Sequence, residues 1–430
     1  MLMSAEGEMR KLRAFWWIAI WTLLIGSVFA ADGGVGNGGG NANDFVTSSG
    51  RIDLNAIRSS GYQGAPDLKG IDVCVDAKSG MRIVRASSTH PPTDDSNHIH
   101  RDDRISPSIL GLDGEAWAAT VYNGRLIVGG RFKIADSVGA NFIAAWDGSS
   151  WSALASGLDS YVYALTVYDG KLIAGGSFTV AGSARANKIA AWNGTSWSAL
   201  ESGMSGNVYA LTIYNSKLIA GGMFTTAGGA SANHIAAWDD SSWSALGSGI
   251  NRTVSALIVY GNKLIAGGGF AAAGGTGANY IAAWDGNTWS ALGLGMDHTV
   301  KALTVYNNKL IAGGRFNKAG GISTNSIAAW DGSSWSVLGS GMSGNVHALV
   351  IYDNRLIAGG DFTTAGDTSA NRIAAWDGSS WSALGSGMNR SVVALTVFDN
   401  KLIAGGWYTT AGGTSARYIA VWDKSFWSAF

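Results

Sequence analysis

The sequence predicts an all-β fold, a seven-bladed β-propeller with four antiparallel strands per blade and a 46-residue repeat. First, a five-residue segment that ends in two glycines occurs seven times, at an interval of 46 residues. Second, seven such units fill residues 109–430 without insertion or deletion. Third, each unit contains four short β-prone runs separated by turn residues. The seven copies begin at Leu126, Leu172, Leu218, Leu264, Leu310, Leu356 and Leu402.

Composition narrows both the class of protein and its source of stability. The formal net charge is zero and only 14% of the 430 residues are charged, so no basic excess indicates nucleic-acid binding. Cys74 is the single cysteine, which excludes a disulfide within the chain. Proline is absent after Pro107, as expected where many backbone N–H groups pair in ladders. Stability must therefore come from burial.

The N-terminus has the pattern of a secretory signal peptide. Arg10, Lys11 and Arg13 precede the apolar residues 14–30, and small side chains suit cleavage after Ala30. We therefore expect residues 1–30 to be removed and the protein to be secreted: extracellular, at the cell surface or periplasmic. An uncleaved membrane anchor is the alternative, although this apolar run is short for a span. No other run approaches that length, so we expect no membrane span after cleavage.

Residues 31–108 are expected to connect this signal to the propeller. Their first part is rich in glycine and asparagine and predicts a flexible spacer. Alternating runs at residues 71–75 and 82–84 predict a small β-hairpin, and a polar linker follows. His98 and His100 lie among carboxylates in that linker and could bind a metal. A mobile segment lacks a fixed second shell, so we expect a solvated linker and no metal.

The second unit illustrates the expected blade. Asp169-Gly170 separates its first two runs and predicts a hairpin with a type I′ turn. A loop follows the second run, and a four-residue turn beginning at Asn193 separates the third run from the fourth. The four runs of this unit are residues 162–168, 171–178, 189–192 and 197–200.

The repeated glycines and tryptophans are explained by stacking of the sheets. Gly175-Gly176 lacks side chains and would permit a neighbouring sheet to approach. Trp192 and Trp197 would fill the wider gap farther from the axis, as would the other recurring tryptophans, fourteen in all. A solenoid is the rival architecture, but it needs a cap, whereas the repeat pattern continues to Phe430. The mode of ring closure stays open; residues 105–110 could add an edge strand.

Each unit combines a glycine pair with two later tryptophans, for example Gly221-Gly222, Trp238-Asp239 and Trp243. With this pattern the unit resembles the kelch repeat of galactose-oxidase-like propellers in secreted bacterial proteins, although it has tryptophan where kelch repeats usually have tyrosine. The Gly-His signature of WD40 repeats is absent. The resemblance covers residues 109–430 and implies the propeller fold, but it implies no particular activity. The copper chemistry of galactose oxidase requires a cysteine, and residues 109–430 contain none.

Function is expected where the units differ, at the end of the ring formed by the strand 2–3 loops and the links between units. Three repeat positions vary there. The first strand carries Trp117, Tyr163, Tyr209, Ser255, Lys301, His347 and Val393. After the glycine pair come Arg131, Ser177, Met223, Gly269, Arg315, Asp361 and Trp407. Before the third strand's isoleucine come Phe142, Lys188, His234, Tyr280, Ser326, Arg372 and Tyr418.

We interpret this end as the binding face of a non-enzymatic interaction module for a glycan or a protein. Aromatic faces with a few polar groups suit such ligands. Neutral variation of exposed loop ends would produce the same pattern. The expected binding residues are Trp117, Tyr163, Tyr209, Lys301, His347, Arg131, Arg315, Asp361 and Trp407.

Two other function classes remain open. A structural surface or matrix protein fits the high glycine content, low charge and near-identical units. An enzyme, galactose-oxidase-like or hydrolytic, is less favoured because only inferred position groups Asp361, Arg315 and His347. We expect no catalytic residue, no cofactor and a monomer. Aspartates such as Asp147 and Asp331 are expected to stabilise turns.

Overall fold

The computed structural model describes residues 71–76, 80–85 and 111–430. The expected signal peptide, spacer and linker lie outside the described residues, as do His98, His100 and residues 105–110. The described residues contain no helix, so none among them is long and apolar enough to cross a membrane.

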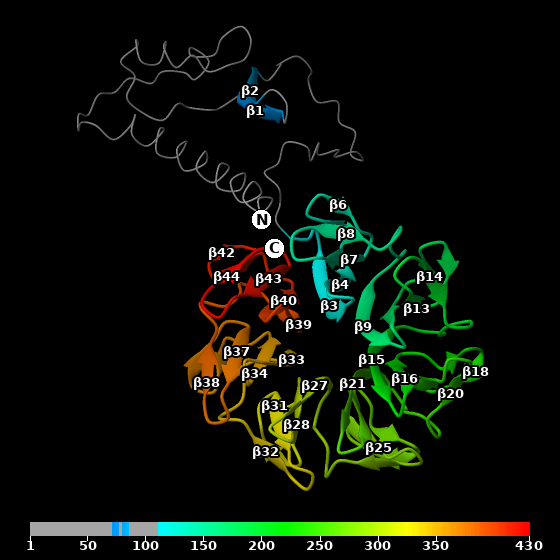
Figure 1. Cartoon of the computed structure of the whole chain (residues 1–430). Coiled ribbons are helices and arrows are strands. Elements are labelled where there is room, and N and C mark those ends of the chain that lie inside the picture. Colours follow the sequence, from blue (N-terminus) through cyan, green and yellow to red (C-terminus); the bar gives the residue numbers. More distant parts are fainter. Residues whose placement is uncertain (1–70, 77–79, 86–110) are drawn as a thin grey trace, which may run out of the picture. The chain divides into compact units, whose positions relative to one another are not determined.

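The chain divides into two compact units, Met1–Pro107 and Ser108–Phe430. In the first unit, β1 (Ile71–Asp76) pairs antiparallel with β2 (Gly80–Arg85) at the positions of the two alternating runs. The second unit is a ring of seven four-stranded antiparallel sheets (Figure 1), which confirms the predicted fold class. We number these blades 1 to 7 in chain order.

Each blade contains its four strands in sequence order from the axis outward. The innermost strands are β3 (Glu115–Tyr122), β9 (Val162–Tyr168), β15 (Val208–Tyr214), β21 (Val254–Tyr260), β27 (Val300–Tyr306), β33 (Val346–Tyr352) and β39 (Val392–Phe398). The second strands are β4 (Arg125–Arg131), β10 (Lys171–Gly176), β16 (Lys217–Gly222), β22 (Lys263–Gly268), β28 (Lys309–Gly314), β34 (Arg355–Gly360) and β40 (Lys401–Gly406).

The two outer strands of each blade are shorter. The third strands are β7 (Ile143–Trp146), β13 (Ile189–Trp192), β19 (Ile235–Trp238), β25 (Ile281–Trp284), β31 (Ile327–Trp330), β37 (Ile373–Trp376) and β43 (Ile419–Trp422). The outermost strands are β8 (Trp151–Ala153), β14 (Trp197–Ala199), β20 (Trp243–Ala245), β26 (Trp289–Ala291), β32 (Trp335–Val337), β38 (Trp381–Ala383) and β44 (Trp427–Ser428).

The first hairpin of each blade has the predicted turn. Asp169 and Gly170 have φ values of 47° and 66°, and the positive sign at both central residues defines a type I′ turn. Its twist matches that of the flanking strands, which explains why asparagine, aspartate and glycine recur at these two positions.

The segment between the second and third strands is more ordered than a plain loop. It forms a two-stranded ribbon that the sequence pattern did not predict, because strands of two residues leave no periodicity. The ribbons are β5 (Ile134–Ala135) with β6 (Val138–Gly139), β11 (Val180–Ala181) with β12 (Ala184–Arg185), β17 (Thr226–Ala227) with β18 (Ala230–Ser231), β23 (Ala272–Ala273) with β24 (Thr276–Gly277), β29 (Lys318–Ala319) with β30 (Ile322–Ser323), β35 (Thr364–Ala365) with β36 (Thr368–Ser369), and β41 (Thr410–Ala411) with β42 (Thr414–Ser415).

The glycine pair serves two contacts rather than one. A Cβ atom on Gly221 would lie 2.5 Å from Val254 Cγ1 in the next blade, so this glycine permits the predicted close approach of sheets. A Cβ atom on Gly222 would instead collide with the carbonyl oxygen of Asn207 in its own blade. The first glycine therefore sets the spacing between blades, and the second sets the spacing within one.

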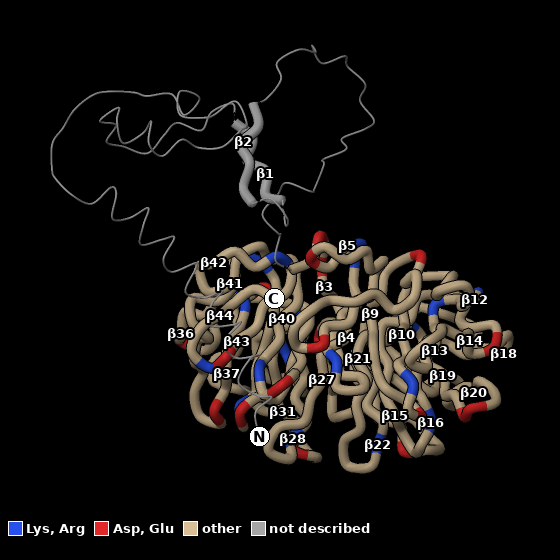
Figure 2. The backbone as a smooth tube through the Cα atoms, turned by 45° about the horizontal axis from the view of Figure 1, so that its top comes forward, with Lys and Arg blue, Asp and Glu red and all other residues tan. Residues whose placement is uncertain are grey.

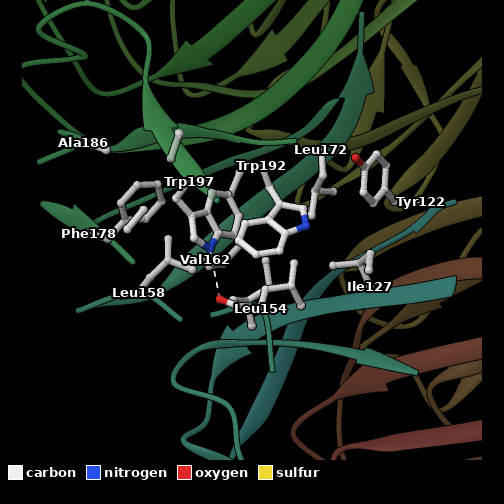
Figure 3. Packing of buried hydrophobic residues seen from close by; sticks show 14 of the residues in the cluster. Tyr122, Ile127, Leu154, Leu158, Val162, Leu172, Phe178, Ala186, Trp192 and Trp197 are labelled. Atoms are coloured by element: carbon white, nitrogen blue, oxygen red, sulfur yellow. Dashed lines mark hydrogen bonds between the residues drawn. The ribbon is translucent and has the colours of Figure 1, made fainter. Parts of the chain in front are cut away.

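The tryptophan pairs pack between blades, as predicted. Trp192 and Trp197 lie 5.3 Å apart at 48°, in a cluster with Leu154 and Ile127 of the preceding blade (Figure 3). Trp197 Nε1 donates a hydrogen bond to the carbonyl oxygen of Leu154 at 3.1 Å. Six blades repeat this bond to the blade before, at 2.9–3.2 Å. Each of these indoles thus buries apolar area and satisfies its only polar atom.

The ring closes by packing whole blades together, since blades 1 and 7 each complete a four-stranded sheet without sharing a strand. Leu112 N donates to the carbonyl oxygen of Arg417 at 3.2 Å across this seam. The same contact joins other neighbouring blades, for example Leu158 N to the carbonyl oxygen of Asn141 at 3.0 Å. Closure therefore repeats an ordinary contact between blades.

Several side chains at this seam nevertheless differ from their counterparts. Ala116, where other blades have valine, faces Gly405. Phe430, where other blades have leucine, lies 5.4 Å from the Trp151 ring. Phe398 replaces a tyrosine whose hydroxyl, in blades 2 to 6, donates to a carbonyl oxygen of the next blade. Among the described residues Trp151 Nε1 has no hydrogen-bond partner, so the seam has fewer polar contacts than its six equivalents.

We predict that Gly221→Ala destabilises the propeller by about 1–3 kcal/mol, because its Cβ atom overlaps Val254 across the interface. Gly277→Ala is the matched control: at this exposed ribbon glycine, a Cβ atom would have no neighbouring atom within 4 Å. Urea unfolding followed by tryptophan fluorescence measures both changes. Equal stability of the two variants would refute the proposed role of the first glycine.

Candidate functional site

The varied residues of the first strands are bulged residues close to the axis. In blade 2, Gly176 pairs with Val162 and Gly175 with Ala164, so Tyr163 has no partner in the register. The same irregularity occurs in all seven blades. A bulge re-aims a side chain and is common beside functional sites. We call the end of the ring that carries these residues, the ribbons and the links between blades the varied face.

Aromatic side chains of three neighbouring blades form a contiguous, half-buried cluster on the varied face. The rings of Trp117 and Tyr163 stack at 5.4 Å and 16°. Tyr163 also lies 5.1 Å from Tyr209. Tyr161 packs edge-on against Trp117 at 5.4 Å and 75°. We call Trp117, Tyr161, Tyr163 and Tyr209 the aromatic arc.

The aromatic arc also carries oriented polar atoms. Burial raises the pKa of Tyr163 despite a hydrogen bond with the Ser177 side chain, so this phenol stays neutral near pH 7. Asn207 Nδ2 donates to the Tyr209 hydroxyl at 3.1 Å. A ligand would therefore meet apolar ring surface together with hydroxyl groups in defined positions.

A polar group, which we call the Asp361 cluster, joins blades 6 and 7. The carboxylate of Asp361 accepts hydrogen bonds from Asn345 Nδ2 at 3.0 Å and from Ser391 Oγ, and it lies 2.8 Å from His347 Nε2. Burial acts to raise the pKa of Asp361, but the hydrogen bonds from Ser391, Asn345 and His347 outweigh it and lower that pKa. Asp361 is thus an ionised acceptor shared by two blades.

The order of groups in the Asp361 cluster differs from that of a hydrolytic triad. In a triad the histidine lies between the serine and the acid, where it can accept the serine proton. Here the carboxylate lies between Ser391 and His347, and Ser391 donates to it directly. The cluster is arranged to hold neighbouring blades in register.

Blade 5 contributes Lys301 and Arg315, which we call the basic pair. Burial lowers the pKa of Lys301, and the charge of Arg315 lowers it further. Both side chains are nevertheless exposed, so water reaches the Lys301 ammonium group although protein surrounds it. Among the described residues no carboxylate oxygen lies within 4.0 Å of either cation.

Two predicted residues have other surroundings. Arg131 lies 3.6 Å from the carboxylate of Glu115, its cross-strand neighbour, so its charge is already compensated. Trp407 is 46% exposed, and no described aromatic ring pairs with it. The structure therefore brings together Trp117, Tyr163 and Tyr209, and separately His347 and Asp361, but it does not join Trp407 to the aromatic arc.

Lys188 and Arg372, two members of the third varied series, bond within their own blade, whereas Phe142 lies 5.6 Å from the Tyr161 ring of the next blade. All seven residues have positive φ, as for Lys188 at 65°. Lys188 Nζ donates to the Ser177 carbonyl oxygen at 3.0 Å, and Arg372 Nη1 donates to the Asp361 carbonyl oxygen at 2.9 Å. Their side-chain donors are thus engaged within the blade, which makes them weak candidates for ligand contact.

Sequence reasoning missed one repeat position, two residues before the bulge. In blade 2 this position supplies Tyr161 of the aromatic arc, and in blade 3 it supplies Asn207, which bonds Tyr209. In blades 6 and 7 it supplies Asn345 and Ser391, which donate to Asp361. Its members are Glu115, Tyr161, Asn207, Thr253, Thr299, Asn345 and Ser391. Two features of the sequence could have indicated this position. It varies between units, and it lies two residues before the bulged residue, a spacing that places both side chains on the same side of an extended chain.

The recurrent aspartates hold turns, as predicted. Asp147 Oδ1 accepts hydrogen bonds from the backbone N–H groups of Ser149 and Ser150 at 2.8 and 2.9 Å, and these bonds lower the pKa of Asp147. Asn193 makes the equivalent contacts in blade 2. In the described part of the chain, no group of three or more histidine, cysteine or acidic residues is placed to hold a metal.

We predict that Asp361→Ala lowers the free energy of unfolding at pH 7 by about 1–3 kcal/mol, because the buried Ser391 hydroxyl loses its acceptor. Since the pKa of Asp361 is lowered by folding, its contribution is present above the ordinary value of 3.8 and is lost as the pH falls below it. The difference in stability between the wild type and the variant should therefore become smaller as the pH falls below 3.8.

Urea unfolding at pH 7 and pH 3 measures this difference. Asp367→Ala, which removes an exposed carboxylate from the ribbon of the same blade, is the control and should change little. A deficit of Asp361→Ala that is as large at pH 3 as at pH 7 would contradict the assigned role of the carboxylate.

Comparison with known proteins identifies the family of this chain. Three solved structures are similar to this chain. The computationally designed Ika8 protein is 18% identical, with 75% of this chain and 88% of that chain covered and a TM-score of 0.46. The WD40 beta propeller domain of Doa1 is 15% identical, with 70% of this chain and 92% of that chain covered and a TM-score of 0.49. A chain of the Mitotic Checkpoint Complex is 14% identical, with 75% of this chain and 95% of that chain covered and a TM-score of 0.48.

No curated protein matches this chain. A family model described as the Rax2 C-terminal beta propeller domain matches residues 149–307 and 291–430, which together span well over half of the chain. The chain therefore belongs to the family of the Rax2 C-terminal beta propeller domain.

Proposed function

We propose that the propeller is a non-enzymatic binding module whose ligand is a glycan held on the varied face. The observation that carries this proposal is the aromatic arc, in which Trp117, Tyr163 and Tyr209 from three consecutive blades are in contact. This repeat position is tryptophan or tyrosine only in blades 1 to 3, whereas the residues that build the interfaces recur around the ring. The repeat alone does not require an aromatic surface at this position.

The chemistry of the aromatic arc suits a sugar. Aromatic rings offer flat apolar area to the C–H faces of a pyranose, and a few placed polar groups fix its orientation. The hydroxyls of Tyr163 and Tyr209 and the amide of Asn207 supply such groups. A protein ligand is the alternative, and it would use the same rings as anchors.

We further propose that the protein is secreted, on the basis of the signal pattern in residues 1–30, which would give it access to extracellular glycans. The kelch-type relationship, drawn from Gly221-Gly222, Trp238-Asp239 and Trp243, is part of the same proposal.

The test is a glycan-array screen of the full chain, followed by titration of the strongest hit against Tyr163→Ala. Removal of the ring that touches both Trp117 and Tyr209 should weaken binding about tenfold or more. Thermal unfolding of the variant verifies that it remains folded.

Phe426→Ala is the matched control, because Phe426 is 59% exposed in the tight turn between β43 and β44, at the other end of the ring. It should bind like the wild type. Absence of glycan binding by the folded chain, or equal binding by both variants, would reject the glycan proposal and favour a protein ligand.

A further inference from the structure

Blade 5 holds two cations that have no carboxylate oxygen within 4.0 Å among the residues that the structure describes. Lys301 is the bulged residue of β27, and Arg315 directly follows the glycine pair of β28. Val300 pairs with Gly314 in the register of these two strands, so the two cations flank one cross-strand pair. Burial lowers the pKa of Lys301, and the nearby positive charge of Arg315 lowers it further.

The neighbouring charges do not neutralise this pair. Asp361 on blade 6 is already engaged by Asn345, Ser391 and His347. Over the rest of the propeller, positions of Lys and Arg alternate with positions of Asp and Glu (Figure 2). The basic pair fits an anion supplied by a ligand.

Because of the position of blade 5 in the ring, one ligand could contact both the basic pair and the aromatic arc. Blades 1 and 2 lie across the ring from blade 5, with β3 and β27 on opposite sides of the axis, and blade 3 is separated from blade 5 by blade 4 (Figure 1). A ligand that covers the axis could place an apolar face against Trp117 and Tyr163 and an acidic group against Lys301 and Arg315. A short acidic oligosaccharide has both features.

We propose that the ligand of the varied face is an anionic glycan, whose carboxylate or sulfate is bound by Lys301 and Arg315 while its sugar rings pack on the aromatic arc. This inference rests on the proposed glycan-binding function and specifies its ligand class. Lys301 supplies a point charge, whereas the guanidinium of Arg315 can bind two oxygens of one acid group.

The experiment titrates the full chain with sets of oligosaccharides that share a backbone and differ only in the acid group: galacturonan, sulfated galactan and neutral galactan, and glucuronan with neutral glucan. The variant is Lys301→Met/Arg315→Leu. The control, Lys263→Met/Lys309→Met, makes the same change in net charge at exposed residues beside the tight turns of blades 4 and 5.

The proposal predicts that at least one acidic member binds the wild type about tenfold or more tightly than its neutral parent, and that this preference declines with added salt. The basic-pair variant should lose the preference, and the control should keep it. Preference for uronic acid over sulfate, or the reverse, would identify the acid.

Binding of neutral and acidic members with equal affinity, or an unchanged preference in the basic-pair variant, would overturn this inference while leaving the glycan-binding function intact. Failure of the folded wild type to bind any member of either set, and of a full glycan array, would instead reject the proposed function. The two failures are therefore distinguishable.

Discussion

The contact on which this structure depends is the close approach of neighbouring blades, repeated around the ring. Gly221 allows the side chain of Val254 to enter the space that a Cβ atom would occupy, and Trp243 bridges neighbouring blades farther out by donating to Leu200. Burial of one tryptophan removes about 150–250 Å² of surface from water, so repeated indoles can stabilise a chain that has no disulfide. The units are alike because each must fit both its neighbours.

This constraint also explains where function can reside. Side chains that face a neighbouring blade are fixed by packing, and those in the tight turns are fixed by the left-handed backbone or by hydrogen bonds such as those of Asp147. The bulged residues are released from the ladder register and lie near the axis, so they can change without disturbing an interface. Aromatic groups on blades 1 to 3 and cations on blade 5 break the sevenfold symmetry there.

Much of this architecture was predictable, because the repeat reports directly on packing. The glycine pairs, the Asp-Gly and Asn-Gly turns and the paired tryptophans each indicate a local geometry, and constant spacing extends it around the ring. The two-residue ribbons left no periodic signal, and the seam substitutions Ala116 and Phe398 acquire meaning only once blades 7 and 1 are known to touch. At the site, repeat position indicated Tyr163 and Lys301, but the participation of Tyr161 and Ser391 depends on contacts between blades that sequence spacing does not report.

The most direct test of the account is a crystal structure of the full chain with the tightest-binding acidic oligosaccharide. The account predicts that the sugar lies on the varied face, with one ring against Trp117 and Tyr163 and its acid group within hydrogen-bond distance of Lys301 and Arg315. A sugar bound at the tight turns or along the outermost strands, with these four side chains free of ligand, would contradict it.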